Sequence, residues 1–310
     1  MTTWFPAPKR TVKALASAAV VLLGIGVLPT LAADPFRTSN ARAIGKNTEA
    51  AFNSIFKEGD YKGAKRYLNQ AASTESNEPL AHAMQAALAF TDGDLEGLNR
   101  HASKTLQTAQ QLTSKDPLRG NLYTAVGHFL AGAYDIKKPG GSTGGALIKL
   151  QKVIQYLDDA KKVDPNDPEL NLLSGYMDLM LAVNLPFSDP AQAIQKIEKY
   201  GSPSYLAYRG IAVGYRDMKQ YSKAMEFVDR ALAATPNNPE VLYLKAQILV
   251  RQGNKQQALE FFKKALEKQA QLPKESAAQI TYEQCRAQIS IDNSNRDCKA
   301  EKDKVRQRVD

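Results

Sequence analysis

The sequence predicts an all-α protein, a solenoid of helical hairpins stacked one after another, and three observations lead to this expectation. The pattern of apolar and small residues in 205–238 recurs in 239–272 after a shift of 34 positions, a period typical of repeat architectures. A polar break divides each of these units near its middle, as expected for two helices joined by a turn. The 310 residues are 43% apolar and 24% charged, which supplies a core and a solvated surface.

The first 33 residues predict an export signal. Three basic residues precede an uncharged apolar stretch, residues 14–31, and small residues follow it. This order is that of a secretory signal peptide, and we expect cleavage before Ala33 or Asp34. The alternative is a retained N-terminal anchor, because about 18 apolar residues can just cross a bilayer. The expected compartment is therefore the periplasm or an equivalent such as the thylakoid lumen, with a membrane-anchored protein as the alternative.

Residues 34–44 are expected to be a linker, and residues 45–272 are expected to form about six hairpins. Gly-Asp pairs at 59–60 and 93–94 mark the middle of the first two units. The third unit is predicted as helices 117–134 and 146–163 around a glycine-rich turn. The fourth is predicted as helices 168–183 and 191–200 around a lengthened turn at 184–190.

Two nearly identical six-residue segments predict helix-to-helix corners. Proline suits the first turn of a helix, and Asn or Asp suits the position that caps it. The segments are Asp164-Pro165-Asn166-Asp167-Pro168-Glu169 and Thr235-Pro236-Asn237-Asn238-Pro239-Glu240.

The fifth unit resembles the tetratricopeptide repeat. Its aromatic, small and apolar residues stand at the positions that this family uses: Tyr208, Ile211, Ala212, Tyr215, Ala224, Val228, Ala231 and Pro236. The sixth unit keeps Leu242, Ala246, Leu249, Ala258, Phe262 and Ala265. The resemblance implies a right-handed superhelix in which small residues let helices cross closely while larger ones fill the gaps between hairpins.

Residues 273–310 are expected to form a C-terminal helical hairpin that caps the solenoid. Helices are predicted over 274–291 and 294–308, the second opened by the Ser-x-x-acid pattern that begins at Ser294. The chain has two cysteines, Cys285 and Cys298. In an exported protein we expect them to be bridged across this hairpin, and two free thiols are the alternative.

The sequence offers little that predicts catalysis, so we expect a protein that is not an enzyme and uses no cofactor. His82, His101 and His128 lack the spacing of a metal site, although the family register points His128 toward the groove. The glycine-rich turn 140–145 lacks the Lys-Ser/Thr of a phosphate-binding loop. A small-ligand or enzymatic helical protein, using that turn or His128, is the less favoured alternative.

The resemblance implies a concave groove lined by the first helix of each unit, and a protein or peptide partner bound there. Aromatic and Arg side chains are typical of such recognition surfaces. Carried onto this chain, the groove positions are Leu172, Tyr176, Leu179, Arg209, Val213, Arg216, Tyr243, Gln247 and Arg251. The alternative for Arg209 and Arg216 is internal pairing with Glu240 and Asp217.

The expected function is that of a scaffold or adaptor outside the cytoplasm, with a membrane-anchored assembly factor as the alternative. The net charge of +9 comes from basic residues interspersed with acidic ones, which argues against nucleic acid as the partner. Membrane contact is expected only through an uncleaved leader.

Overall fold

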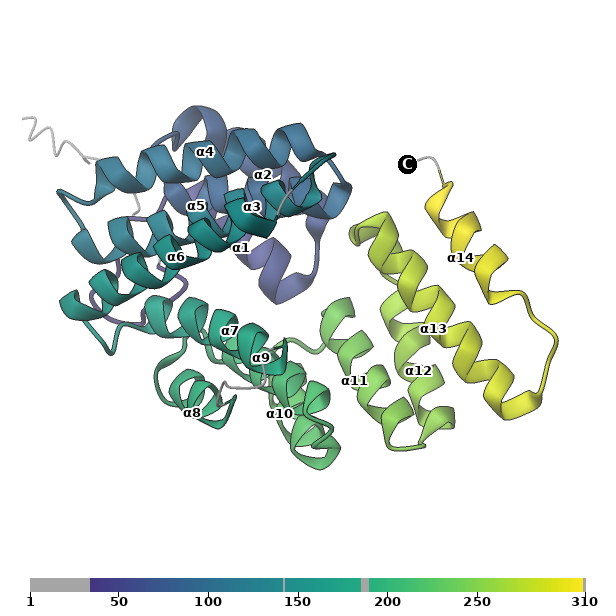
Figure 1. Cartoon of the computed structure of the whole chain (residues 1–310). Coiled ribbons are helices and arrows are strands. Elements are labelled where there is room, and N and C mark those ends of the chain that lie inside the picture. Colours follow the sequence, from purple (N-terminus) through teal and green to yellow (C-terminus); the bar gives the residue numbers. More distant parts are fainter. Residues whose placement is uncertain (1–33, 142, 185–189, 309–310) are drawn as a thin grey trace, which may run out of the picture. The chain divides into compact units, whose positions relative to one another are not determined.

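The computed structural model describes residues 34–141, 143–184 and 190–308. The leader with its expected cleavage site and positions 185–189 of the lengthened turn lie outside these residues. Within them the chain runs through consecutive antiparallel helical hairpins (Figure 1), which confirms the predicted all-α fold. None of the described helices has the length and the apolar character needed to cross a bilayer.

The first three hairpins show how short sequence signals set helix boundaries. Gly59 and Gly93 end their helices in the left-handed conformation, with φ of +69° and +76°. The next residues, Asp60 and Asp94, cap the following helices by accepting hydrogen bonds from backbone N–H groups at 2.8 Å. The elements are α1 (Lys46–Phe52), the π-helical turn η1 (Asn53–Glu58), α2 (Tyr61–Thr74), α3 (Pro79–Asp92), α4 (Leu95–Leu112), α5 (Pro117–Lys137) and α6 (Thr143–Val163).

The glycine-rich turn is shorter than predicted. We expected a loop at 140–145 and a helix from residue 146, but α6 begins at Thr143 and takes two of the glycines into its first turn. The Asp135 carboxylate near the end of α5 accepts hydrogen bonds from Lys138, at 3.0 Å, and from Lys149 of α6. The hydrogen bond from Lys149 to Asp135 links the first part of α6 to the end of α5 across the turn.

Two of the next three hairpins begin at the predicted corners. Pro168 and Pro239 are the first residues of α7 and α11. Asp167 accepts a hydrogen bond from the Leu170 N–H at 2.8 Å, and Asn238 accepts one from the Glu240 N–H at 2.9 Å. The elements are α7 (Pro168–Asn184), α8 (Pro190–Tyr200), α9 (Ser204–Asp217), α10 (Tyr221–Ala234), α11 (Pro239–Arg251), α12 (Lys255–Leu266) and the 3₁₀ turn η2 (Gln269–Gln271).

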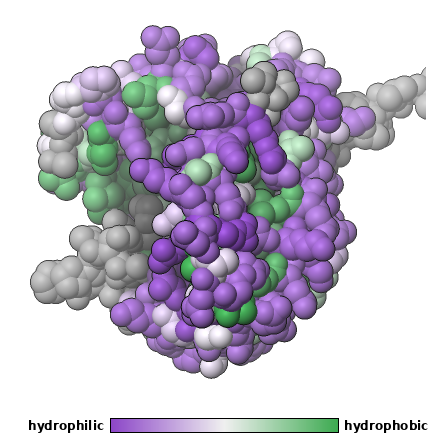
Figure 2. Space-filling model, turned by 90° about the vertical axis from the view of Figure 1, so that its right-hand side faces the viewer, coloured by the Kyte–Doolittle hydropathy of each residue, from purple (hydrophilic) through white to green (hydrophobic). Residues whose placement is uncertain are grey.

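The C-terminal hairpin consists of α13 (Lys274–Asp292) and α14 (Cys298–Arg306). The predicted start of the second helix at Ser294 is wrong. Asn293 ends α13 with φ of +54°, and Asp297 rather than Ser294 caps α14, accepting from two backbone N–H groups at 3.1 and 3.0 Å. The expected pairing is present: Cys285 and Cys298 are joined, with Cα atoms 5.5 Å apart, an ordinary disulfide spacing. Hydrophilic residues cover most of this face of the molecule (Figure 2).

The largest core cluster joins residues that are far apart in the chain. Phe36 and Ile44, in the segment expected to be a linker, are 1% and 2% exposed. They share one cluster with Phe52 of α1 and with apolar residues of α7, α9 and α11. The first described residues are therefore packed into the core and contact helices in the second half of the chain.

Candidate functional site

The N-terminal hairpin covers part of the predicted groove. The Tyr61 hydroxyl of α2 donates to Glu240 Oε1 of α11 at 2.9 Å, and Asn238 Nδ2 donates to the carbonyl of Phe56 at 3.2 Å. Tyr176, predicted as a groove residue, donates its hydroxyl to the carbonyl of Leu206 at 2.7 Å. Burial raises the pKa of Tyr176 to about 12. The Tyr176 side chain is therefore half-buried against the core, with its hydroxyl bonded internally.

Arg209, another predicted groove residue, is held in an internal ion pair. Its Nη1 lies 3.0 Å from Glu240 Oε2, on the same carboxylate that accepts from Tyr61. Burial opposes the charge, yet the attraction of Glu240 outweighs it and raises the pKa of Arg209. The internal pairing that we considered as the alternative is thus the arrangement found. Val213 and Tyr243 are half-buried and pack against the core clusters.

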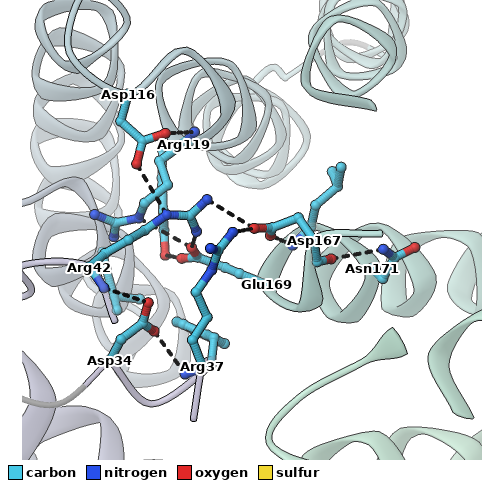
Figure 3. Close-up of polar contacts among 12 residues, drawn as sticks. Asp34, Arg37, Arg42, Asp116, Arg119, Asp167, Glu169 and Asn171 are labelled. Carbon is cyan, nitrogen blue, oxygen red and sulfur yellow. Dashed lines mark hydrogen bonds and ion pairs between the residues drawn. The ribbon is translucent and has the colours of Figure 1, made fainter. Parts of the chain in front are cut away.

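A second internal network anchors the segment 34–44 (Figure 3). Arg42 donates from Nη2 to Asp167 Oδ2 and from Nη1 to Glu169 Oε2, both at 2.9 Å. Arg37 also bonds to Asp167, and Arg119 Nε bonds to Glu169 at 3.2 Å. Asp167 and Glu169 are 0% exposed, and buried carboxylates are stable only when paired in this way. This network ties the segment 34–44 to the start of α7 through two carboxylates that are fully buried.

Three of the predicted groove residues do come together at an open surface. Arg216 at the end of α9, with Gln247 and Arg251 of α11, line a cleft whose cavity volume is about 810 Å³. We call it the C-terminal cleft. Its other polar and charged lining residues come from the end of α9, the α9–α10 turn, α10, α12 and α13: Asp217, Lys219, Tyr221, Lys255, Gln279, Tyr282, Glu283, Arg286 and Ser290.

A chain of hydrogen bonds orders one wall of the C-terminal cleft. Arg216 pairs through Nε with Asp217 Oδ1 at 2.8 Å and donates from Nη1 to Gln247 Oε1 at 2.6 Å. Gln247 Nε2 in turn donates to Glu283 Oε2 of α13 at 3.0 Å. Burial, and then the neighbouring charge of Glu283, raise the pKa of Tyr243 beside this wall. The side chains of three helices are thereby held in one arrangement.

The rest of the cleft carries cationic side chains that, unlike those of the ordered wall, are not paired within the described part of the chain. Arg251, Lys255 and Arg286 have no carboxylate partner among the residues that the structure describes. The lining as a whole carries five cationic and two anionic side chains. Because unpaired guanidinium groups bind carboxylates through two parallel hydrogen bonds, this surface is suited to an acidic ligand.

Sequence reasoning missed the contribution of α13 to this cleft. We expected residues 273–310 to be a polar cap, whereas α13 supplies Gln279, Tyr282, Glu283, Arg286 and Ser290 to the lining. A signal was present: Pro273 follows Pro239 by the same 34 residues that relate the last two repeats. That spacing places α13 as the first helix of a further unit, with one side on the groove.

The histidines have structural environments. His128 stacks on Tyr156 of α6, with ring centroids 5.7 Å apart, so its ring faces its own hairpin partner rather than the groove. His82 Nε2 lies 2.9 Å from the carbonyl of Ser76. In the described part of the chain no group of three or more His, Cys, Asp or Glu residues is arranged to hold a metal ion.

Comparison with known proteins finds one family model and several solved structures that are similar to this chain. Residues 217–289 match the family model of anaphase-promoting complex, cyclosome, subunit 3. Among solved structures, the C-terminal part of a TPR repeat-containing protein from Cytophaga hutchinsonii is similar, at 17% identity over 83% of this chain and 92% of that one, with a TM-score of 0.40. A tetratricopeptide repeat protein from Parabacteroides merdae is similar at 15% identity over 85% and 100%, with a TM-score of 0.39. No curated protein matches.

Proposed function

We propose that this chain, whose fifth and sixth units resemble the tetratricopeptide repeat, is an exported, non-enzymatic scaffold that binds an acidic segment of a partner protein in the C-terminal cleft. Folds of this kind commonly mediate protein–protein interaction. The observation that carries the proposal is the set of cleft cations, Arg251, Lys255 and Arg286, without carboxylate partners in the described structure.

The chemistry of the C-terminal cleft supports an extended acidic peptide as the ligand. Arg251 and Arg286 stand on neighbouring first helices, α11 and α13, so carboxylates on one peptide can pair with both. Tyr221 and Tyr282 add aromatic surface, which anchors peptides at low entropic cost. The Arg216–Gln247–Glu283 wall is ordered before binding, and preorganisation of this kind favours affinity.

Export is the part of the proposal that rests on the leader and on the cysteine pair. Disulfides persist in oxidising compartments, and Cys285 and Cys298 are joined. Intact-mass measurement of native protein tests export: we expect a mature chain that begins at Ala33 or Asp34 and lacks Trp4. Trp4 retained in membrane-bound protein would support the anchored alternative, and Trp4 retained in a cytosolic protein would overturn export.

Partner binding is tested by site-specific photo-crosslinking. A photoreactive residue at Ser290, inside the cleft, should capture a protein from an extract of the native compartment. The same residue at Lys299, which is exposed on α14, should not capture it. The captured protein is then purified and its affinity is measured against variants of the full chain.

Arg251→Ala combined with Arg286→Ala should weaken that affinity at least tenfold, because a hydrogen bond from a charged group contributes about 1.5–3 kcal/mol. The matched control, Lys299→Ala with Lys304→Ala, also removes two positive charges, both exposed on α14, and should change affinity less than about threefold. Equal affinities of the cleft variant and the wild type would show that the cleft is not the binding site.

A further inference from the structure

The turn end of the α5–α6 hairpin exposes aliphatic side chains to solvent. Ile136 is 59% exposed, and Leu147 and Ile148 are each 60% exposed. Scattered apolar residues on a surface are ordinary. These three, however, flank a single turn, and Ile154, 51% exposed, continues the outer side of α6 two helical turns after Leu147. A patch of exposed aliphatic residues at one end of a hairpin indicates a surface that contacts an apolar partner or a membrane.

Positive charge surrounds the same turn. Lys137, Lys138, Lys149 and Lys152 lie within four residues of the exposed aliphatic side chains. The nearby carboxylate is Asp135, which accepts hydrogen bonds from Lys138 and Lys149. The next acidic residues along α6, Asp158 and Asp159, are each matched by a lysine at 2.9 and 2.7 Å. Four cations therefore face one anion at the turn end.

Two of these lysines have no carboxylate partner among the described residues. Lys137 lies over the ring of Phe90, with Nζ 5.4 Å from the centroid, and Phe90 is itself 42% exposed. Lys152 lies near enough to His128 to help lower the pKa of that ring, after the effect of burial. Lys137 and Lys152 are thus available to an anionic surface that meets the exposed Ile136, Leu147 and Ile148.

The residue types distinguish a lipid surface from a protein partner. Cores of protein interfaces are enriched in aromatic residues, Met and Arg and depleted of Lys, which describes the C-terminal cleft better than this turn. Bare Leu and Ile side chains bordered by Lys are typical of helices that lie in the interface of an anionic bilayer. The proposed export of the chain, which rests on the uncharged stretch 14–31, would also bring it to a membrane.

We propose that the α5–α6 tip, defined as Ile136, Lys137, Lys138, Leu147, Ile148 and Lys152, binds the surface of an anionic lipid bilayer. The aliphatic side chains enter the boundary between headgroups and acyl chains, and the lysines pair with lipid phosphates. None of these residues lines the C-terminal cleft, so the tip and the cleft are separate sites. The scaffold would thereby hold its acidic partner beside a membrane even after the leader is removed.

A tryptophan reporter tests insertion at the tip in the full chain. Trp4→Phe removes the native tryptophan, and Leu147→Trp places a new one at the tip. The control, Ile291→Trp, stands at another exposed aliphatic position, 40% exposed on α13. Both chains are mixed with phosphatidylcholine vesicles, with and without phosphatidylglycerol. A reporter at a defined site separates tip insertion from any binding by the leader, which both chains share.

With phosphatidylglycerol present, the emission of Leu147→Trp should move to the blue and be quenched by brominated acyl chains. The emission of Ile291→Trp should not change. Adding Lys137→Glu and Lys152→Glu should abolish the blue shift, whereas Lys299→Glu with Lys304→Glu should leave it intact. Circular dichroism verifies the fold of each variant, and these exposed substitutions should not alter it.

Three results would overturn the proposal. One is an unchanged Leu147→Trp spectrum on phosphatidylglycerol vesicles. Another is an equal blue shift on neutral vesicles, which would remove the role of the lysines. The third is a shift caused by the crosslinked partner and not by lipid, which would make the tip a protein-docking surface. Failure here leaves the Arg251 and Arg286 experiment unaffected, so the two proposals can fail separately.

Discussion

Two glutamates at equivalent positions connect distant parts of this chain. Glu169 and Glu240 each follow the proline that begins a first helix, α7 or α11. Glu169 accepts hydrogen bonds from Arg42 and Arg119, and Glu240 accepts them from Arg209 and Tyr61. A carboxylate at the start of a helix also interacts favourably with the helix dipole. The Pro-Glu pair therefore serves both as a helix start and as an attachment point for the N-terminal residues.

Comparison of equivalent positions in two repeats identifies one residue, Lys219, with an unfavourable backbone conformation. Lys219 has φ of +60°, and the equivalent position 34 residues later is Gly253, with φ of +86°. A left-handed conformation destabilises a residue with a side chain by about 1–2 kcal/mol, part of which glycine loses again through its greater freedom in the unfolded state. We expect Lys219→Gly to raise the free energy of unfolding by about 0.5–1 kcal/mol.

Urea denaturation measures this effect, and a second glycine serves as the control. Lys223→Gly, at an exposed position inside α10, should instead lower the free energy of unfolding by about 1 kcal/mol. A loss of stability in both variants would contradict the assignment of strain to Lys219.

At the scale of elements, the C-terminal hairpin does not stand at a free end. Its helix α13 contacts α3, and the η2 turn before it contacts α2. Tyr61 and Leu88 of the N-terminal hairpins line the same cavity as Pro273 and Val305. A simple array of repeats couples only to its neighbours in sequence, but here the last elements also contact the first.

Removal of the disulfide should therefore reduce the local stability of helices at both ends of the chain. Cys298→Ser opens the link between α13 and α14, which on the chain-entropy model lowers stability by about 3 kcal/mol. Hydrogen exchange should become faster in α13 and α14, and also in α2 and α3, while α8 changes least. Loosening that fades steadily from the C-terminus toward the N-terminus, with α2 and α3 unaffected, would show that these contacts are weak.

At the scale of the whole molecule, one core cluster extends from Phe36 to Ile248. Phe52 of α1 belongs to this cluster and is 2% exposed. The centroid of its ring lies 5.0 Å from that of Phe36 and 4.7 Å from that of Phe56. Phe52→Ala should lower the free energy of unfolding by about 3–5 kcal/mol. Because the cluster includes α7, α9 and α11, the loss should appear in those helices as well.

Hydrogen exchange in α9 and α11 reports this long-range effect, with Tyr67→Ala as the control. Tyr67 is an aromatic residue of α2 that is 36% exposed, and its removal should leave α9 and α11 unchanged. Faster exchange confined to α1 and α2 in the Phe52→Ala protein would mean that the N-terminal hairpin unfolds on its own.

The sequence by itself determined the all-α class, the hairpins and their corners, because these depend on signals within a few residues: apolar spacing, Gly-Asp turns and Pro at helix starts. The resemblance to the tetratricopeptide repeat implied a shared groove for Arg216, Gln247 and Arg251, and these three residues do line one cleft. Only the tertiary structure decided that Tyr176 and Arg209 are bonded internally and that α13 completes the cleft. Arg42 bonds to carboxylates 125 and 127 residues away, and helical periodicity specifies which face of a helix is apolar but not which distant segment packs on it.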